Sequence, residues 1–307
     1  MAPRRPPGQP GAFQGGAAVE GPLPLGQQAL AQFLLKVSEQ SLQTTHGDPM
    51  KKMNSLVAAL LAVSSVSAFA QATAPAAAPA PDWTITGNAG LFSDYRFRGI
   101  SQTDKKAAFQ GGFDVAHSSG FYLGNWNSNI DSSFFGGANI EMDFYGGFKG
   151  AVGDISYDVG ALYYYYPGSD RSGTAKIKNT EVYVGASYGP VSAKVYYPIS
   201  DFFSAEDLIG GGNAAGSYYL DLSGAYDLGN GFGLNAHVGY QKAKGAAKGL
   251  YAGESSVIDW KLGATYGLSN GFVLGLAYID TDNDDIAGAT GKKISKGTAL
   301  LSLSKAF

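Results

Sequence analysis

The sequence has 307 residues, with 25 Asp and Glu against 22 Lys and Arg, a formal net charge of −3, no cysteine and a mean hydropathy of −0.07. The slightly acidic balance argues against nucleic-acid binding, and the lack of cysteine is compatible with an oxidising periplasm. Such a mean hydropathy is unusual for a membrane protein, yet a membrane β-barrel gives this value because only alternate residues face lipid.

A secretory signal peptide is predicted at residues 50–70. Met50-Lys51-Lys52 forms a basic start, residues 56–66 form a short apolar core, and Ala68-Phe69-Ala70 has the small-x-small pattern of a cleavage site. We expect cleavage between Ala70 and Gln71. The apolar core is too short to span a bilayer as a helix, which needs about 20 residues.

The segments on either side of this signal are predicted to lie outside the fold. Residues 1–49 are rich in Pro, Gly, Gln and Ala, and they precede a signal that normally works at an N-terminus. We favour a start codon assigned too early, with a disordered extension removed with the signal as the alternative. Residues 71–82 form an Ala/Pro-rich periplasmic spacer. After cleavage the net charge is 17 − 22 = −5, since 5 basic and 3 acidic residues precede the cleavage site.

Residues 83–307 are predicted to form one domain of twelve short strands. Residues 155–165 illustrate the pattern, because Ile155, Tyr157 and Val159 alternate with polar or small residues. Residues 258–266 repeat it, with Trp260 and other apolar residues alternating with polar ones. Strand side chains point to opposite faces with a period of two, so each segment has one apolar face and one polar face.

Charged residues support this assignment of faces. Those on the polar parity of their segments are Asp94, Arg96, Arg98, Asp114, Glu141, Asp143, Asp158, Glu181, Lys194, Asp221, Asp259 and Lys261. Lys305 is the exception, but it lies near the chain end, where a long side chain can reach the membrane interface. Residues 121–130 stay ambiguous, because Phe121 and Leu123 favour one parity and Tyr122 and Trp126 the other. A bulge there would change which of Asn125, Asn127 and Asn129 face inward.

The connections alternate between tight and long. The tight ones are residues 118–120, 150–154, 189–190, 227–231 and 267–271, and the longer ones include 167–178, 200–216, 242–256 and 280–295. Bacterial outer-membrane barrels have short periplasmic turns, long external loops and an even number of strands. The predicted fold is therefore an all-β, antiparallel, up-and-down transmembrane β-barrel of about 12 strands in the outer membrane of a Gram-negative cell.

Several segments resemble a known family. The segments are "GNAGLFSDYRFRGISQT" (87–103), "FQGGFDVAHSSGFYLGNWNSNI" (109–130) and the final "LSLSKAF". They resemble the TorF family of porin-like proteins, long grouped as a conserved bacterial family of unknown function. The resemblance implies an outer-membrane barrel acting as a channel, and it supplies neither catalytic residues nor a solute. Phe307, with Leu301 and Leu303 on its parity, resembles the signature that the outer-membrane assembly machinery recognises, although Lys305 departs from it.

The polar-face residues and His237 are the predicted pore lining. Arg96 and Arg98 either favour the passage of anionic solutes at the channel mouth or pair with carboxylates across the lumen and hold a loop in place. The other charged residues lean acidic, which favours a mild cation preference.

Other sites are not supported by the sequence. The loop Asp280–Asp285 lacks the Gly and Glu of an EF-hand, so we interpret it as solvated, with a weak divalent-ion or lipopolysaccharide contact as the alternative. His117 and His237 are the histidines of the expected mature chain, and neither lies near a serine and an acid in a catalytic arrangement. We expect no enzymatic activity, cofactor or metal.

The predicted function is passive diffusion of ions or small polar solutes through a porin-like channel. Twelve strands lie between the filled barrels of eight strands and the open channels of sixteen, which indicates a narrow, water-filled path. The alternative is a plugged, non-conducting barrel with a structural or surface-binding role. The expected partners are outer-membrane lipids, lipopolysaccharide and the assembly machinery. The permeant solute and the oligomeric state stay open.

Overall fold

A computed structural model describes residues 82–171, 173 and 175–307. The predicted extension (1–49), the signal peptide (50–70) with its cleavage residues Ala68, Ala70 and Gln71, and all of the spacer but residue 82 lie outside these described residues.

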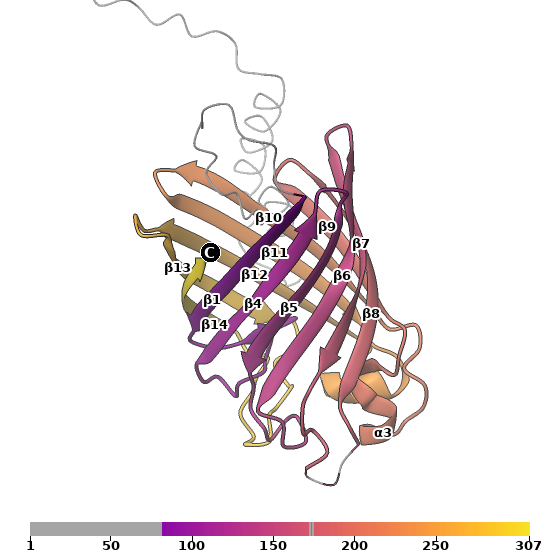
Figure 1. Cartoon of the computed structure of the whole chain (residues 1–307). Helices are drawn as coiled ribbons and strands as arrows, with labels where there is room; N and C mark the ends of the chain where they lie inside the picture. Colours follow the sequence, from indigo (N-terminus) through magenta and orange to yellow (C-terminus); the bar gives the residue numbers. More distant parts are fainter. Residues whose placement is uncertain (1–81, 172, 174) are drawn as a thin grey trace, which may run out of the picture. The chain divides into compact units, whose positions relative to one another are not determined.

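Twelve strands form one closed antiparallel barrel (Figure 1). They are β1 (Trp83–Phe92), β4 (Ala108–His117), β5 (Phe121–Asn129), β6 (Ile140–Val152), β7 (Ile155–Tyr165), β8 (Lys178–Tyr188), β9 (Val191–Pro198), β10 (Tyr218–Gly229), β11 (Phe232–Lys242), β12 (Ser256–Gly267), β13 (Phe272–Thr281) and β14 (Thr298–Ala306). Each strand pairs with the next one along the wall, and β1 pairs with β14. The predicted fold class is confirmed.

The seam between β1 and β14 closes the barrel. Its register runs from Asn88 opposite Ala306 to Phe92 opposite Ser302. Beyond the last strand residue, the backbones of Gly87 and Phe307 exchange two hydrogen bonds, of 2.6 and 2.9 Å. A Cβ on Gly87 would lie 2.6 Å from the Phe307 ring, so glycine lets this ring lie across β1.

The outer wall is apolar and the inner wall is polar. Exposed outer residues include Ile85, Leu91, Phe109, Phe113, Val184, Leu220, Leu262, Leu274, Leu276 and Leu301. On β10, Asp221 pairs with Gly239 and Lys194 on the inner side, whereas Leu222 pairs with Val238 and Ala193 on the outer side. The alternation of apolar and polar residues in the sequence thus corresponds to the outer and inner faces of the barrel wall.

Single cysteines test these faces, because the chain has no cysteine of its own. In protein reconstituted in lipid, we expect a membrane-impermeant maleimide to label Asp221→Cys, because that side chain faces the polar interior of the barrel. Leu222→Cys should stay unlabelled, because lipid covers it. Labelling of the second variant but not the first would show that the faces are inverted.

Lys305 lies on the outer parity, opposite Phe272. Its ammonium donates to the carbonyl of Asn270 at 3.1 Å and lies 5.1 Å from the centre of the Phe272 ring. The charge therefore reaches the turn at the end of the barrel, in the way that long side chains leave an apolar zone.

The parity of β5 is resolved without a bulge, because its register with β4 and β6 is continuous. Phe121 and Leu123 are exposed on the outer side, whereas Tyr122 points inward. Asn125, Asn127 and Asn129 share the outer parity. Asn125 is only 7% exposed, because its register partners on the outer wall are Phe113 and Phe144.

The two ends of the barrel differ, as predicted. The short-turn end has connections at residues 118–120, 153–154, 189–190, 230–231 and 268–271. The long-loop end has loops at residues 93–107, 130–139, 166–177, 199–217, 243–255 and 282–297. The short helices η1 (Phe202–Ser204), α3 (Ala205–Ile209) and η2 (Gly245–Tyr251) lie in these loops, at the bottom of Figure 1. In the described part of the chain, no helix has the length and apolarity to cross a membrane.

Two hydrophobic clusters pack the loops against one another at the long-loop end. The first contains Tyr95, Ala108, Ile130, Phe135, Ala138, Tyr164, Tyr166 and Ile177. The second contains Phe202, Ala214, Ala243, Ala247, Tyr251, Val257, Ile286 and Ile294. These loops therefore have a core of their own.

Candidate functional site

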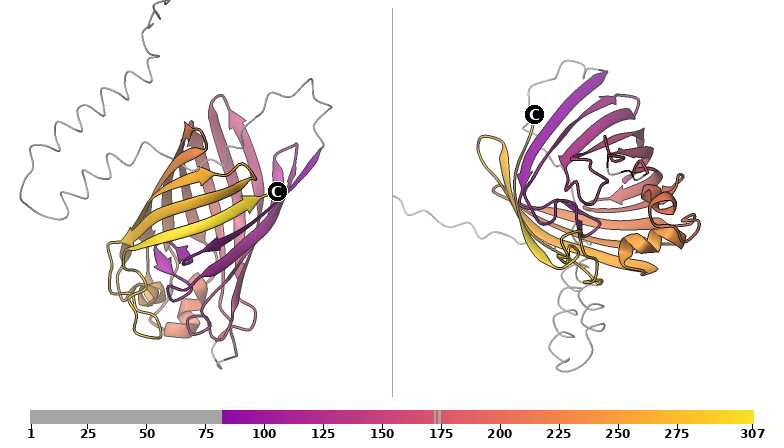
Figure 2. Two further views of the ribbon diagram at one scale, coloured as in Figure 1. Left: turned by 90° about the vertical axis from the view of Figure 1, so that its left-hand side faces the viewer. Right: turned by 90° about the horizontal axis from the view of Figure 1, so that it is seen from below.

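The first loop, residues 93–107, folds into the barrel instead of away from it. It contains a small hairpin of β2 (Arg96–Phe97) and β3 (Ile100–Ser101), joined by Arg98 and Gly99. Both turn residues have positive φ, 47° and 80°, as a two-residue type I′ turn requires. Figure 2 shows the two short purple arrows inside the wall, near the long-loop end. We call residues 93–107 the inner hairpin loop.

Gly99 lets the hairpin tip touch the wall. A Cβ at this position would lie 2.3 Å from Cγ2 of Thr281 and 2.7 Å from Cβ of Asp259. These residues face inward on β13 and β12. Gly99 is thus required both by its positive φ and by the close approach.

Gly99→Ala is expected to destabilise the protein by roughly 1–3 kcal/mol. The added methyl group would clash with the wall and push the hairpin tip away from it, and alanine disfavours the positive φ of this position. Gly153→Ala is the matched control, since Gly153 also has positive φ (59°) but has nothing within 4 Å of the added carbon. The midpoint temperature of the heat-dependent shift in gel mobility measures both. Equal midpoints for the two variants would contradict the contact at the tip.

Arg98 fixes the tip to two strands. Its Nη2 donates to both Glu181 oxygens, at 2.7 and 3.0 Å, and its Nη1 donates to Oε1 of Gln241 at 2.8 Å. The guanidinium lies 4.3 Å from the centre of the Tyr219 ring. The Arg98 and Glu181 side chains are 5% and 0% exposed. Since β8 and β11 are separated in the wall by β9 and β10, this contact crosses part of the lumen.

Asp94 and Arg96 hold the loop in its folded form. Asp94 accepts hydrogen bonds from Ser101, Thr103 and Arg96, at 2.6, 2.9 and 2.6 Å. Arg96 also donates to the carbonyls of Gly99 and Ile294, at 2.8 and 3.0 Å.

From the sequence, Asp94, Arg96 and Arg98 are assigned to the polar face of a barrel strand. This assignment is wrong, because β1 ends at Phe92 and the chain turns inward. The alternation continues through these residues because β2 is itself a strand, although of a different sheet.

Further contacts tie the base of the inner hairpin loop to its neighbours. Lys292 donates to Asp104 at 3.0 Å, and Lys106 to Asp131 at 2.7 Å. The hydrogen bond from Lys292 lowers the pKa of Asp104, and that from Lys106, with help from Ser133, lowers the pKa of Asp131 to about 2. Both ion pairs therefore persist at neutral pH.

Tyr95 joins the loop to a second group of carboxylates. Its hydroxyl donates to Oε1 of Glu141 at 2.9 Å, and its ring packs edge-on against Trp126. Asp143 lies two residues along β6 on the same inner face. Glu141 and Asp143 are 1% and 8% exposed.

Further charged pairs lie on the inner wall, where the Lys194, Asp158 and Asp221 side chains are 28%, 18% and 25% exposed, whereas Asp259 is only 4% exposed. Lys194 contacts Asp158 at 2.8 Å, and Tyr122 donates to the same carboxylate at 2.6 Å. His237 lies between two carboxylates, with Nδ1 3.2 Å from Asp221 and Nε2 2.9 Å from Asp259. The wall of this region thus presents charges of both signs.

All the remaining residues of the predicted pore lining belong to barrel strands and lie on the inner parity. They are Asp114, Glu141, Asp143, Asp158, Glu181, Lys194, Asp221, His237, Asp259 and Lys261. The prediction missed Lys149, which lies 4.4 Å from the Tyr122 ring centre, and the neutral residues Gln241 and Asn179. Gln241 and Asn179 sit on the polar parity of their strands, a signal that a list of charged residues alone does not use.

The described residues contain no group of three His, Cys, Asp or Glu side chains able to hold a metal ion. In the loop Asp280–Asp285, two carboxylates have separate partners. Asp282 accepts a hydrogen bond from the backbone N–H of Ile258, and Asp285 pairs with Lys293. His117 lies beside Ser119 at a turn, with Nδ1 2.7 Å from the hydroxyl.

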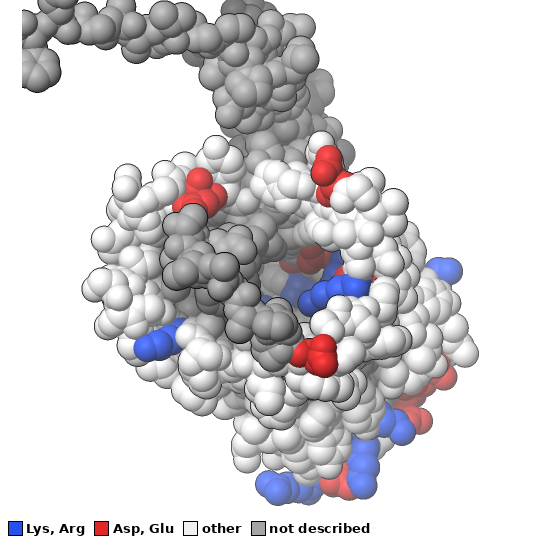
Figure 3. Space-filling view, turned by 45° about the horizontal axis from the view of Figure 1, so that its top comes forward, with Lys and Arg blue, Asp and Glu red and all other residues white. Residues whose placement is uncertain are grey.

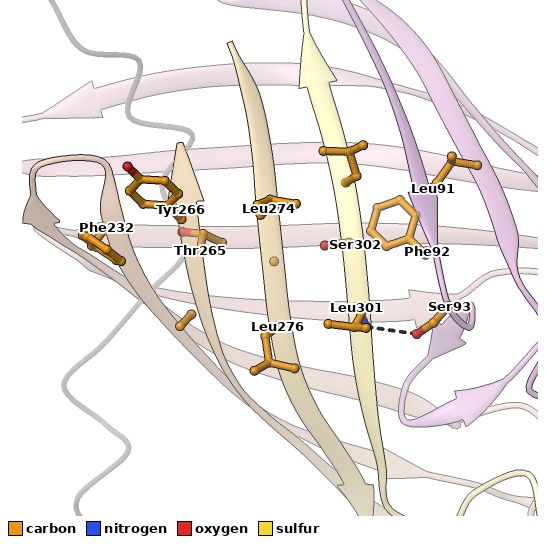
Figure 4. Close-up of a pocket in the computed structure, with 13 residues that line it drawn as sticks. Leu91, Phe92, Ser93, Phe232, Thr265, Tyr266, Leu274, Leu276, Leu301 and Ser302 are labelled. Atoms are coloured by element: carbon orange, nitrogen blue, oxygen red, sulfur yellow. Dashed lines mark hydrogen bonds between the residues drawn. The ribbon is translucent and has the colours of Figure 1, made fainter. Parts of the chain in front are cut away.

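The short-turn end is hollowed. Figure 3 looks toward this end and shows Lys or Arg and Asp or Glu side chains inside the opening. On the outer wall, by contrast, an apolar groove runs across the seam and is lined by Leu91, Phe232, Leu274, Leu276, Leu301 and Leu303 (Figure 4). Its lining suits hydrocarbon chains, whereas the charged interior suits polar solutes.

A family model described as "Bacterial protein of unknown function (Gcw_chp)" matches residues 76–307. No curated protein matches the sequence.

Solved structures with similar folds include porins. The NanC porin matches with 9% identity and a TM-score of 0.48, over 73% of this chain and 99% of the other. The KdgM porin, solved in complex with disordered oligogalacturonate, matches with 9% identity and a TM-score of 0.44, over 73% and 98%. OccAB3 of Acinetobacter baumannii matches with 10% identity and a TM-score of 0.37, over 75% and 65%. These identities and scores are too low to transfer a solute to this chain.

Proposed function

Since the chain belongs to the Gcw_chp family of bacterial proteins of unknown function, we propose that it is a porin-like channel of the outer membrane that passes ions or small polar solutes by passive diffusion. The observation that carries the proposal is the closed barrel with an apolar outer wall and a charged interior. A soluble barrel would bury apolar side chains inside and expose polar ones, whereas a transmembrane barrel does the reverse.

The same surface supports a location in the membrane. The exposed outer residues include Ile85, Leu123, Val184, Leu276 and Leu301, which are between 55% and 73% exposed. Contact with lipid accounts for an apolar area of this extent around a whole barrel. We therefore infer contact with outer-membrane lipids and, at the long-loop end, with lipopolysaccharide. Export by the signal peptide and insertion by the assembly machinery, guided by Phe307, complete this proposal.

Passage would be limited by the inner hairpin loop. It crosses the lumen at the long-loop end, and Arg98, Glu181 and Gln241 form its tightest contacts with the wall. Solutes would meet charges of both signs, including Lys194, Asp158 and the His237 cluster. The channel would thus select mainly by size, without catalysis and without a cofactor.

A second candidate function is a plugged barrel with a structural or surface-binding role. It is favoured by the burial of the Arg98–Glu181 pair and by the two hydrophobic clusters that pack the loops together. In this case the inner hairpin loop would be a permanent closure.

Swelling of liposomes that contain the purified protein separates the two functions. We expect swelling in small polar solutes and a steep loss of rate as solute size increases, because the hairpin narrows the path. Empty liposomes and liposomes with heat-denatured protein are the controls. Folded, inserted protein that causes no swelling with any solute would favour the plugged barrel.

A further inference from the structure

Two neighbouring carboxylates beside the inner hairpin loop lack a compensating charge. Glu141 and Asp143 lie two residues apart on β6, so both point into the barrel. Glu141 uses one oxygen to accept from Tyr95, while Oε2 is buried without a hydrogen bond. Asp143 has a buried Oδ1 without a partner, and its carboxylate takes part in none of the hydrogen bonds or ion pairs between described residues.

The nearby arginines of the loop are committed elsewhere. Arg98 is paired with Glu181 and Gln241. Arg96 is paired with Asp94 and with backbone carbonyls, and only its Nη2 is left without a hydrogen-bond partner among the described residues. An uncompensated buried carboxylate costs several kcal/mol, and two adjacent ones cost more through mutual repulsion. The negative charge of Glu141 and Asp143 therefore has to be neutralised by something other than the basic side chains of the loop.

Asn179 provides a second, independent sign of a ligand. It lies on β8 and is 0% exposed, and neither its amide oxygen nor its amide nitrogen has a hydrogen-bond partner in the described structure. Its place on the wall follows from the register, since Asp143 is opposite Tyr164 on β7 and Tyr164 is opposite Asn179. Leaving a buried polar group unsatisfied costs roughly 1–3 kcal/mol, so such an amide calls for a further partner, such as a water molecule or an ion.

We propose that Glu141, Asp143 and Asn179 form a binding site for a small hard cation on the inner wall, beside the inner hairpin loop. All three supply oxygen ligands, and they contain no sulfur or imidazole, which suits calcium better than a transition metal. Two carboxylates balance the charge of one divalent ion. The amide oxygen of Asn179 adds a neutral ligand, and water completes the shell.

A bound cation would also stabilise the inner hairpin loop. Glu141 is the residue that accepts the hydroxyl of Tyr95, at 2.9 Å. A cation that neutralises Glu141 removes the repulsion from Asp143 and keeps Tyr95 in place. The site is separate from the proposed channel function, because it requires only that the described side chains bind an ion.

Titration calorimetry of calcium chloride into EDTA-treated, purified protein in detergent tests the site. We expect one saturable binding event for the native chain, with a dissociation constant at or below roughly the millimolar range found for weak calcium sites. Asp143→Asn should weaken binding by roughly tenfold or more, because it removes a charged ligand. Asn179→Ala should weaken it measurably, whereas Asp227→Asn, the same chemical change at an exposed position near the short-turn end, should not.

Folding is checked in each variant by the heat-dependent shift in gel mobility. If one or both site variants fail to fold, Glu141→Gln, which keeps the shape of the side chain and the contact with Tyr95, is titrated in their place and should also weaken binding. The absence of saturable binding to the native chain would overturn the proposal. So would native affinity in folded Asp143→Asn, since the carboxylates would then be neutralised by protons.

Discussion

Replacing Arg98 by alanine is expected to destabilise the long-loop end and to raise the conductance of the channel. The substitution removes the partner of Glu181, which is 0% exposed, and leaves a buried carboxylate without compensation. Breaking a buried pair in this way costs about 3–5 kcal/mol. It also releases the hairpin tip from β8 and β11, so the path beside it widens. The midpoint of the gel-mobility transition and the single-channel conductance measure the two effects.

Two further variants control this prediction. Arg171→Ala makes the same substitution at an exposed loop position and should change stability by no more than about 0.5 kcal/mol. Combining Arg98→Ala with Glu181→Gln removes the unpaired charge and should recover most of the stability, while the wider path persists. An Arg98→Ala protein with the same midpoint and conductance as Arg171→Ala would show that the pair does not hold the loop.

Excising the hairpin tip is expected to give the largest increase in conductance. The backbone N–H of Gln102 donates to the carbonyl of Tyr95 at 2.8 Å. A two-residue Asn-Gly turn can therefore replace residues 96–101 and connect Tyr95 to Gln102. The twelve barrel strands keep all their register pairs, because β2 and β3 form a separate sheet. We therefore expect an intact barrel with conductance steps several-fold larger than those of the native protein.

The control for the shortened chain is made on the same purified protein that is used for the conductance recording. The heat-dependent shift in gel mobility establishes that the shortened chain forms a barrel. An intact barrel with native conductance would mean that the narrowest part of the path lies elsewhere, for example at the clusters formed by the other loops.

The barrel could be predicted from the sequence because its physical signal is local. A strand that faces lipid on one side and water on the other shows its period in every pair of residues, as Leu222 and Asp221 do on β10. Loop lengths then gave the connectivity. The signal weakened at β5, because Asn125, Asn127 and Asn129 put polar groups on the outer face, where they bond to backbone and to each other.

Pairing of Arg98 with a carboxylate across the lumen was one of two alternatives from the sequence, and the Arg98–Glu181 pair agrees with it. The residues that form the inner hairpin loop were missed for a different reason. Residues 94–98 alternate like a strand, and the turn signal is the pair Arg98-Gly99, which is weaker than Asn-Gly or Asp-Gly. The contacts of Arg98 with Glu181 and Gln241 join positions 83 and 143 residues away. Such pairs depend on how the barrel closes, so neither periodicity nor spacing can reveal them.

The central claim is that an aqueous path runs through the interior of this barrel, past the inner hairpin loop. Planar bilayer recording of the purified native protein under a salt gradient tests it most directly. We expect discrete, small conductance steps, with a reversal potential that indicates a modest preference for cations, because acidic side chains outnumber basic ones on the inner wall. A bilayer that stays silent although the protein has inserted as a folded barrel would contradict the claim.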